Sequence, residues 1–318
     1  MTHPPTGQSV IVVRELRKKY DGADTETLRG VDLEVRRGEV FCLLGPNGAG
    51  KSTAVEILEG VRTRTAGEVS VLGADPEAYR RSWRARIGVV PQGTGTFADL
   101  TVREVVSHYA AFYPAPLTVG RTIEMVGLTP VADKRTTHLS GGQRRRLDVA
   151  VGTVGDPELI FLDEPTTGLD PVARREAWDL VRFFAERGKT VVLTTHYLDE
   201  AEALADRVGV IAAGRMVRVG TVASLREGSA AATSVAFTAH GPLTGRPLPP
   251  LPAGTAAEPS AGGAIRLRTR TPTAVLAALL PWARSAGVEE LPDLRVHRPS
   301  LEEIYLDLIK SDAREAAG

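Results

Sequence analysis

The segment VFCLLGPNGAGKST, residues 40–53, decides the fold of this chain. Its apolar beginning, Val40–Leu44, predicts a strand that is covered on both faces. A glycine-rich loop follows, and then a helical stretch at Ala54–Leu58. The loop matches the pattern G-x-x-x-x-G-K-[ST] through Gly45, Gly50, Lys51 and Ser52. A strand, this loop and a helix in this order predict a nucleotide phosphate site rather than a chance match in a glycine-rich chain.

Each residue type in the loop suits the binding of phosphate. Glycines let the backbone turn so tightly that successive N–H groups point at one phosphate. The helix that follows contributes unpaired N–H groups and the positive end of its dipole. Lys51 adds a mobile positive charge for the β- and γ-phosphates, and the Ser52 hydroxyl suits Mg²⁺. We therefore expect the nucleotide to contact Gly45, Pro46, Asn47, Gly48, Ala49, Gly50, Lys51, Ser52 and Thr53.

Residues 8 to about 220 alternate strand-like runs with helical stretches. Further buried strands are predicted at Leu159–Leu162, Val191–Leu193 and Val208–Ile211. Helices are predicted at Ala173–Arg187 and Tyr197–Ala205. This alternation predicts an α/β fold with a parallel sheet. Two earlier runs, separated by a polar loop, predict an antiparallel side sheet at Ser9–Arg14 and Val31–Val35.

The segment LIFLDEP places two acidic residues at the carboxyl end of a buried strand, where open parallel sheets bind ligands. Beside a phosphate loop, Asp163 is in the position of a Mg²⁺ anchor. Glu164 can accept a proton from an attacking water. The alternative is an Asp-Glu turn that caps a helix, and the phosphate loop makes this the weaker interpretation. Pro165 helps to end the strand.

Between these two motifs lies LSGGQ, Leu139–Gln143, followed by three arginines, Arg144–Arg146. The order of phosphate loop, Gln loop, LSGGQ, acidic strand end and histidine closely resembles the ATP-binding subunits of ABC transporters over roughly residues 10–220. The resemblance implies a P-loop NTPase core with an antiparallel side sheet at residues 8–220, and a helical subdomain at about 96–155. For the arginines, a solvated basic face and a direct functional role are both open.

The resemblance also assigns roles across two copies of the chain. A hydroxyl and backbone N–H groups at a helix start form a second anion-binding element at Ser140, Gly141, Gly142 and Gln143. In the family this element binds the γ-phosphate of ATP that is held by the other subunit's phosphate loop. Asp170, in TTGLDP, matches a loop that reaches across the dimer. We therefore expect a head-to-tail homodimer with two nucleotides at its interface.

Three further positions match the family one by one. Gln92, in IGVVPQ, matches the residue that approaches Mg²⁺ and the attacking water and senses the membrane partner. His196 matches the histidine that contacts the γ-phosphate, although a lone histidine after a strand is usually a polar loop residue. Tyr20 matches an aromatic residue that stacks on adenine, and a surface tyrosine near Lys18 and Lys19 is the alternative. The implied catalytic set is Glu164, His196 and Gln92, and the implied metal ligands are Ser52, Gln92 and Asp163.

Residues 221–318 predict a small α+β accessory domain. Strand-like runs occur at Ala232–Thr238 and Ala264–Arg270, and a helix follows Thr271 and Pro272. Residues 241–263 hold six of the 21 prolines and predict a loop. Ser300–Glu303 is a capping box that leads into IYLDLI. The tail PSLEEIYLDLI is similar to that of daunorubicin-resistance-type exporter subunits, which implies export; a tail that only stabilises a dimer is the alternative.

Composition excludes several functional classes. Lys and Arg total 39, as do Asp and Glu, so there is no net basic field for nucleic acid. The longest apolar run, Ala274–Leu280, is too short to span a membrane, and the single cysteine, Cys42, indicates a reducing setting. We expect an ATPase at the cytoplasmic face of the membrane, bound to a separately encoded integral-membrane permease. An importer subunit, or a non-transport ATP switch, is the alternative function.

Overall fold

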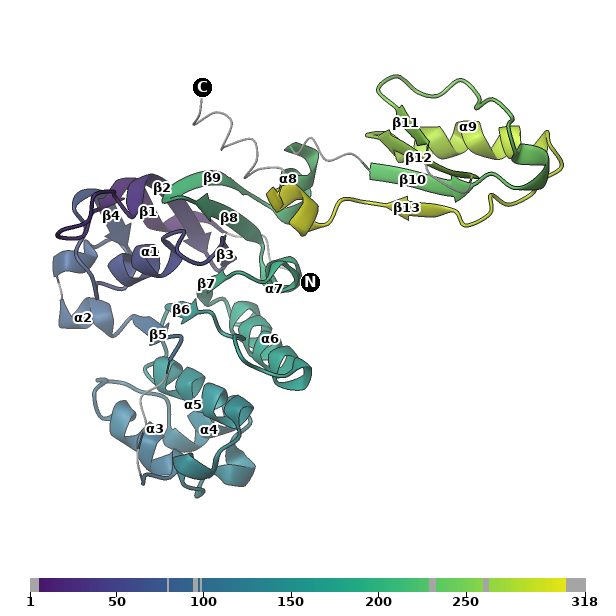
Figure 1. Cartoon of the computed structure of the whole chain (residues 1–318). Coiled ribbons are helices and arrows are strands. Elements are labelled where there is room, and N and C mark those ends of the chain that lie inside the picture. The colour runs from purple at the N-terminus through teal and green to yellow at the C-terminus, as the bar shows by residue number, and fades with distance from the viewer. Residues whose placement is uncertain are drawn as a thin grey trace. The chain divides into compact units, whose positions relative to one another are not determined.

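The computed structural model describes residues 6–78, 80–93, 97, 99–228, 233–259 and 263–306. The chain divides into two compact units, Met1–Val222 and Ala223–Gly318, and each is described by itself (Figure 1). This division falls two residues beyond the break in composition at residue 220.

The first unit is built around a six-stranded sheet with the order β5-β6-β7-β3-β8-β9. Its strands are β3 (Val40–Leu44), β5 (Ile87–Val90), β6 (Leu159–Asp163), β7 (Thr190–Thr195), β8 (Arg207–Ala212) and β9 (Arg215–Gly220). All neighbours are parallel except β8 and β9. Every residue of β3 is buried, because β3 lies in the middle of the sheet. The predicted α/β fold with a parallel sheet is confirmed.

The helix after the phosphate loop, α1 (Lys51–Leu58), begins three residues earlier than the apolar pattern predicts. The pattern marks its first apolar residue at Ala54. Gly50, however, takes a left-handed conformation with φ of 103°, and the helix begins directly after it. Lys51 and Ser52 therefore lie in the first helical turn, where backbone N–H groups are unpaired.

A second sheet with the order β2-β1-β4 is antiparallel, as predicted. Its strands are β1 (Thr6–Lys18), β2 (Leu28–Arg37) and β4 (Ala66–Val71). Apolar side chains of this sheet share one core with α1 and the central sheet, for example Ile11, Leu33, Ile57 and Phe161. The phosphate loop is therefore held between two sheets.

Helices α3, α4 and α5 pack against one another beyond the edge strand β5 (Figure 1). The helices of this unit are α2 (Arg81–Arg84), α3 (Val102–Ala110), α4 (Val119–Met125), α5 (Gly141–Thr153), α6 (Pro171–Glu186) and α7 (Leu198–Leu204). Short 3-10 turns lie at Pro76–Ala78, Thr129–Val131 and Thr136–His138. The three packed helices carry the LSGGQ segment, because α5 begins at Gly141.

The backbones of α5 and β5 come close together at Gly152 and Gly88. A Cβ atom added at Gly88 would lie 2.3 Å from the carbonyl oxygen of Gly152 and 2.8 Å from Pro157 Cγ. We therefore expect Gly88→Ala to lower the free energy of unfolding by about 1–3 kcal/mol, because α5 must shift. Thermal unfolding measures this change. Gly120→Ala is the control, since no atom of the described residues lies within 4 Å of its added Cβ; equal Tm values for the two variants would contradict the expectation.

The second unit is a four-stranded antiparallel sheet with the order β11-β12-β10-β13. Its elements are α8 (Val222–Gly228), β10 (Thr233–Thr238), β11 (Ala256–Pro259), β12 (Ala264–Thr269), α9 (Pro272–Arg284) and β13 (Arg295–His297). Helix α9 packs on one face of the sheet. The core between them includes Val235, Phe237, Leu267, Leu279 and Trp282. This unit therefore has a hydrophobic core of its own.

One prediction for this unit is wrong. Residues 241–263, predicted as a loop, contain a 3-10 turn at Gly241–Leu243 and the strand β11. Strand β11 lies at the edge of the described sheet and pairs with β12, so its proline and small residues are tolerated there. The predicted capping box is confirmed: Glu303 N donates to Ser300 Oγ at 3.2 Å, and Ser300 N donates to Glu303 Oε2 at 2.9 Å. Ala232 and residues 307–309 of the predicted elements lie outside the described residues.

Candidate nucleotide site

The phosphate loop joins the central strand β3 to α1, and its glycines are required for different reasons. A Cβ atom at Gly45 would lie 2.3 Å from the carbonyl oxygen of Ile211, so only glycine fits beneath β8. At Gly50, the left-handed φ of 103° is strained for any residue with a side chain. Glycine is therefore required at Gly45 because β8 lies so close, and at Gly50 because of the left-handed backbone.

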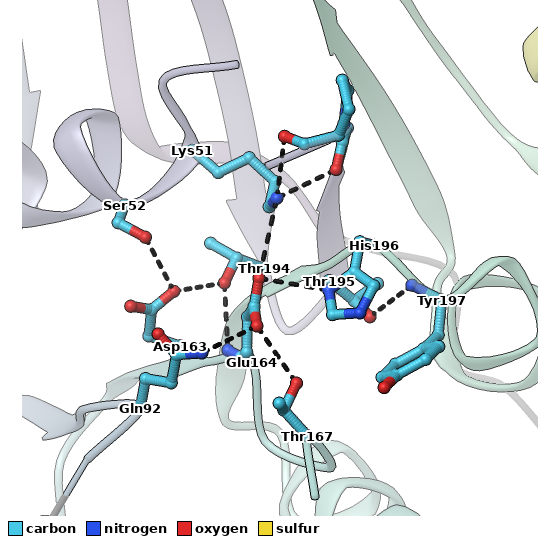
Figure 2. Close-up of polar contacts among 12 residues, drawn as sticks. Lys51, Ser52, Gln92, Asp163, Glu164, Thr167, Thr194, Thr195, His196 and Tyr197 are labelled. Atoms are coloured by element: carbon cyan, nitrogen blue, oxygen red, sulfur yellow. Dashed lines mark hydrogen bonds and ion pairs between the residues drawn. The ribbon is translucent and has the colours of Figure 1, made fainter. Parts of the chain in front are cut away.

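Lys51 places its charge inside the loop. Its Nζ donates to the carbonyl oxygens of Gly45 at 2.9 Å and Pro46 at 3.2 Å, and lies 3.7 Å from Glu164 Oε1 (Figure 2). Burial lowers the pKa of Lys51, and the Glu164 and Asp163 carboxylates oppose this effect. The side chain is only 4% exposed. A buried cation that is held by two loop carbonyls is preorganised for the phosphates of a nucleotide.

Asp163 is the last residue of β6, and register places it beside Thr194 of β7. The Thr194 hydroxyl donates to Asp163 Oδ1. The Ser52 hydroxyl donates to the same carboxylate oxygen at 3.4 Å (Figure 2). The structure thus brings together the carboxylate and the hydroxyl that the sequence predicts as metal ligands.

Glu164 lies at the centre of the polar network. Its backbone has φ of 43°, in the left-handed region, and its N–H donates to the Thr194 hydroxyl at 3.0 Å. Gln92 Nε2 donates to Glu164 Oε2 at 2.9 Å, and the Thr167 hydroxyl donates to the same atom at 3.0 Å. His196 Nδ1 lies 3.2 Å from Glu164 Oε1 (Figure 2). The three predicted catalytic residues therefore meet around one carboxylate.

An open hollow lies in front of this network. Its lining includes Thr27, Asn47, Gly48, Gly50, Lys51, Ser52, Thr53, Gln92 and Glu164. Loop residues, the predicted base and the Gln loop thus face one space. The hollow has mainly polar walls, as a phosphate site requires.

Tyr20 is joined to the hollow through Thr53, which lines it. The two side-chain hydroxyl oxygens are 3.1 Å apart. Lys18 Nζ lies 5.3 Å from the centroid of the Tyr20 ring, and Arg62 Cζ lies 5.0 Å from it. The Tyr20 ring is half-buried, and its hydroxyl is held by Thr53. The ring therefore lies next to the phosphate loop.

The LSGGQ residues and Asp170 lie at two other helix starts. Ser140 caps α5: Gln143 N donates to Ser140 Oγ at 3.2 Å, and Ser140 N donates to Gln143 Oε1 at 3.1 Å. Gly141 and Gly142 form the first turn of α5. Asp170 caps α6 by accepting two backbone N–H bonds at 2.9 Å. The predicted site residues therefore form a group at the hollow and a separate group at helix starts.

The sequence did not predict the position of Arg145, whose guanidinium is buried. It donates to the carbonyl oxygens of Pro91 at 2.6 Å, Asp163 at 3.0 Å and Pro165 at 3.1 Å. A solvated face is thus the wrong interpretation for Arg145, which fixes the ends of two strands at the site. The signal was its spacing of four residues from the buried Val149 on the same helix face.

Glu59, directly after α1, is a further acidic residue that sequence analysis did not single out. Burial raises the pKa of Glu59 to about 8, and the charges of Asp163 and Glu56 add to this effect. The folded protein therefore binds one proton more than the unfolded chain between pH 4.5 and about 8. Stability must fall as the pH rises through this window.

Glu59→Gln removes the charge and thus this pH dependence. We expect the variant to be more stable than the natural protein by a few kcal/mol at pH 8.5, with the gain disappearing toward pH 4.5. Urea unfolding at a series of pH values measures this gain. Glu186→Gln, at an exposed position of α6, is the control. A Glu59→Gln protein with unchanged or lower stability at pH 8.5 would contradict the expectation.

The chain is similar to known proteins along nearly its whole length. A family profile described as "ABC transporter" matches residues 28–167, and one for an "ABC transporter domain-containing protein-like, C-terminal domain" matches residues 233–300. The daunorubicin resistance ATP-binding protein DrrA3 of Streptomyces coeruleorubidus is 35% identical over 96% of this chain and 98% of its own length. The Nod factor export ATP-binding protein I of Neorhizobium galegae is 44% identical over 64% of this chain and 60% of its own length.

Solved structures agree with these similarities. The ATP-binding subunit of an ABC transporter has a TM-score of 0.61 at 25% identity, over 69% of this chain and 92% of its own. A dimeric bacterial ABC transporter cassette has a TM-score of 0.59 at 26% identity, over 67% of this chain and 98% of its own. The predicted family and fold are therefore confirmed. The chain belongs to the ABC transporter family, as an ATP-binding subunit that hydrolyses ATP.

Proposed function

We propose that this chain powers the export of drugs or other small amphipathic molecules. The observation that carries the proposal is the similarity to a daunorubicin resistance protein over 98% of that protein's length, which includes the C-terminal unit. A relative named for Nod factor export supports the same direction of transport. Binding of the exported molecule belongs to a membrane partner in this proposal.

The proposed partners are an integral-membrane permease, encoded separately, and a second copy of this chain. Among the described residues, no helix is both long enough and apolar enough to cross a bilayer. The permease would hold the ATPase at the cytoplasmic face of the membrane. Nucleic acid is not a proposed partner, because basic and acidic residues balance at 39 each.

We propose that hydrolysis depends on the network around Glu164. A water that attacks the γ-phosphorus gives its proton to the Glu164 carboxylate, and the bond from phosphorus to the ADP oxygen breaks. Gln92 and Thr167 orient the base by hydrogen bonds to its Oε2. The Nδ1 atom of His196 lies 3.2 Å from Glu164 Oε1, and His196 contacts the γ-phosphate in this proposal. Lys51 stabilises the charge on the β- and γ-phosphates.

Mg²⁺ fits the oxygen donors at the carboxyl end of β6. Ser52 and Asp163 place a hydroxyl and a carboxylate 3.4 Å apart, and Mg²⁺ prefers such oxygen ligands. Gln92 donates its Nε2 to Glu164, which leaves its amide oxygen available as a third ligand. The cation, when bound, neutralises phosphate charge.

The proposed catalytic unit is a head-to-tail dimer. Ser140, Gly141, Gly142 and Gln143 of one copy would bind the γ-phosphate that the phosphate loop of the other copy holds. Their place at the start of α5, away from the hollow of the same chain, supports this arrangement. The similarity to a solved cassette dimer supports it too. ATP then favours the closed dimer, and hydrolysis releases it.

An accumulation assay tests the direction of transport. The chain and the membrane protein encoded by the adjacent gene are expressed together in a drug-sensitive bacterium. The cellular uptake of a fluorescent anthracycline is then measured. We expect lower accumulation than in cells that express Glu164→Gln with the same membrane protein. Higher accumulation would identify an importer, and equal accumulation would exclude anthracyclines as cargo; both results contradict the proposal as tested.

A further inference from the structure

Two helices of the first unit begin beside residues that the proposed dimer uses. Asp170 caps α6, because its Oδ1 accepts hydrogen bonds from Val172 N and Ala173 N. Helix α7 begins at Leu198, two residues after His196. Because α6 begins directly after Asp170 and α7 begins two residues after His196, a shift of either helix moves a residue of the site.

One face of α6 contacts α7 at three successive turns, and the outer two contacts are partly exposed. Arg174 Nη1 lies 3.3 Å from Asp199 Oδ2, and its guanidinium lies 4.9 Å from the centroid of the Tyr197 ring. Two turns later, Arg182 Nη2 donates to the carbonyl oxygen of Ala203 at 3.4 Å. Water competes for such contacts, so they hold the two helices together only weakly.

The middle contact is different, because its acceptor is fully buried. Trp178 Nε1 donates to Glu200 Oε1 at 3.1 Å, and Glu200 is 0% exposed. Trp178 lies four residues from both Arg174 and Arg182, on the same helix face. A hydrogen bond to a buried carboxyl cannot be replaced by water, so breaking it leaves an unsatisfied polar group.

The carboxyl of Glu200 also faces the hydroxyls of Thr166 and Thr195. Thr166 lies on the segment between Glu164 and Asp170, and Thr195 is the last residue of β7, directly before His196. Burial raises the pKa of Glu200, and the nearby Thr195 and Thr166 hydroxyls and the Trp178 indole oppose this effect. One buried side chain thus contacts α6 and both segments that lead to the site.

We propose that the Trp178–Glu200 hydrogen bond joins α6 and α7 into one body, so that Asp170 and His196 shift together. This proposal rests on the proposed dimer, in which Asp170 reaches the second copy. Docking of the second copy at Asp170 then sets the position of His196 beside Glu164. Trp178 and Glu200 are positioning residues, because they act on the reaction through Asp170 and His196. Hydrolysis is cooperative in ATP as a result of this link.

Two single variants remove the Trp178–Glu200 hydrogen bond, one by changing its donor and one by changing its acceptor. Trp178→Phe keeps the aromatic bulk and removes the indole donor, and Glu200→Leu keeps the approximate volume and removes the acceptor. We expect each to lower kcat about fivefold to tenfold and to bring the Hill coefficient for ATP close to 1, with KM for ATP nearly unchanged. The double variant should lose no more than the more affected single variant, because both changes remove one bond.

Two further variants are controls for this experiment. Glu200→Gln keeps an oxygen acceptor for Trp178, so we expect it to retain wild-type kcat and cooperativity. Glu202→Gln changes an exposed residue of the same helix and should behave like the wild type. Thermal unfolding of every variant separates lost coupling from lost folding.

The outcomes distinguish failure of the coupling from failure of the dimer. A wild-type Hill coefficient of 1, with no ATP-dependent dimer of Glu164→Gln, would overturn the proposed dimer and the coupling with it. Wild-type cooperativity that persists in Trp178→Phe and Glu200→Leu would overturn the coupling alone. Losses of kcat that multiply in the double variant would also overturn the coupling. A loss of cooperativity in Glu200→Gln would do the same.

Discussion

Glu164→Gln should abolish ATP turnover and leave nucleotide binding intact. The amide has the shape of the carboxylate and keeps an oxygen for the hydrogen bonds from Gln92 and Thr167. It cannot take the proton of the attacking water, and loss of a general base lowers the rate about 10²- to 10⁴-fold. The closed dimer then persists, because hydrolysis no longer opens it.

Phosphate release at saturating ATP and Mg²⁺ measures the turnover of this variant. Size-exclusion chromatography with ATP measures the dimer, which we expect for Glu164→Gln and not for the wild type at equilibrium. Glu186→Gln, on the exposed side of α6, is the control for the loss of one negative charge. Wild-type turnover in Glu164→Gln would show that another group is the base.

Lys51→Ala should weaken ATP binding about 10- to 100-fold, as expected for the loss of charge-assisted hydrogen bonds worth about 1.5–3 kcal/mol. The ammonium group donates to Gly45 O and Pro46 O and lies 3.7 Å from Glu164. Without it, two loop carbonyls lose their donor, and the ammonium charge no longer lies between the Glu164 carboxylate and the nucleotide phosphates.

Titration with a fluorescent ATP analogue measures this loss of affinity. Lys134→Ala removes a lysine from the exposed surface and should bind the analogue like the wild type. Thermal unfolding without nucleotide shows whether Lys51→Ala is folded. A folded Lys51→Ala protein with wild-type affinity would mean that the phosphates do not bind in this loop.

Much of the fold could be predicted because its signals are local. The apolar run Val40–Leu44 and the glycine pattern after it fixed the centre of the sheet and the position of the phosphate loop. Polar turns between early strands predicted the antiparallel side sheet. The strand β11 could not be predicted, since Ala256–Pro259 has no strand-like pattern and is ordered by pairing with β12.

The site was less predictable where it depends on tertiary contacts. Asp163 and Glu164 could be placed at a strand end, but only the register of β6 and β7 sets Thr194 beside Asp163. The left-handed backbone of Glu164 has no local signal, because non-glycine residues rarely adopt it. Arg145 looked like its two arginine neighbours in sequence, and only the packing of α5 buries it.

The central claim is that each ATP is held by the phosphate loop of one copy and the LSGGQ segment of another. Mixing two inactive variants, Lys51→Ala and Ser140→Arg, tests this most directly. A mixed dimer would contain one complete site, built from the loop of the Ser140→Arg chain and the Ser140 segment of the Lys51→Ala chain. We predict that the mixture regains about a quarter of wild-type ATPase activity, since half of the dimers are mixed and each has one working site. Two inactive variants that stay inactive when mixed, although they form dimers, would contradict the account.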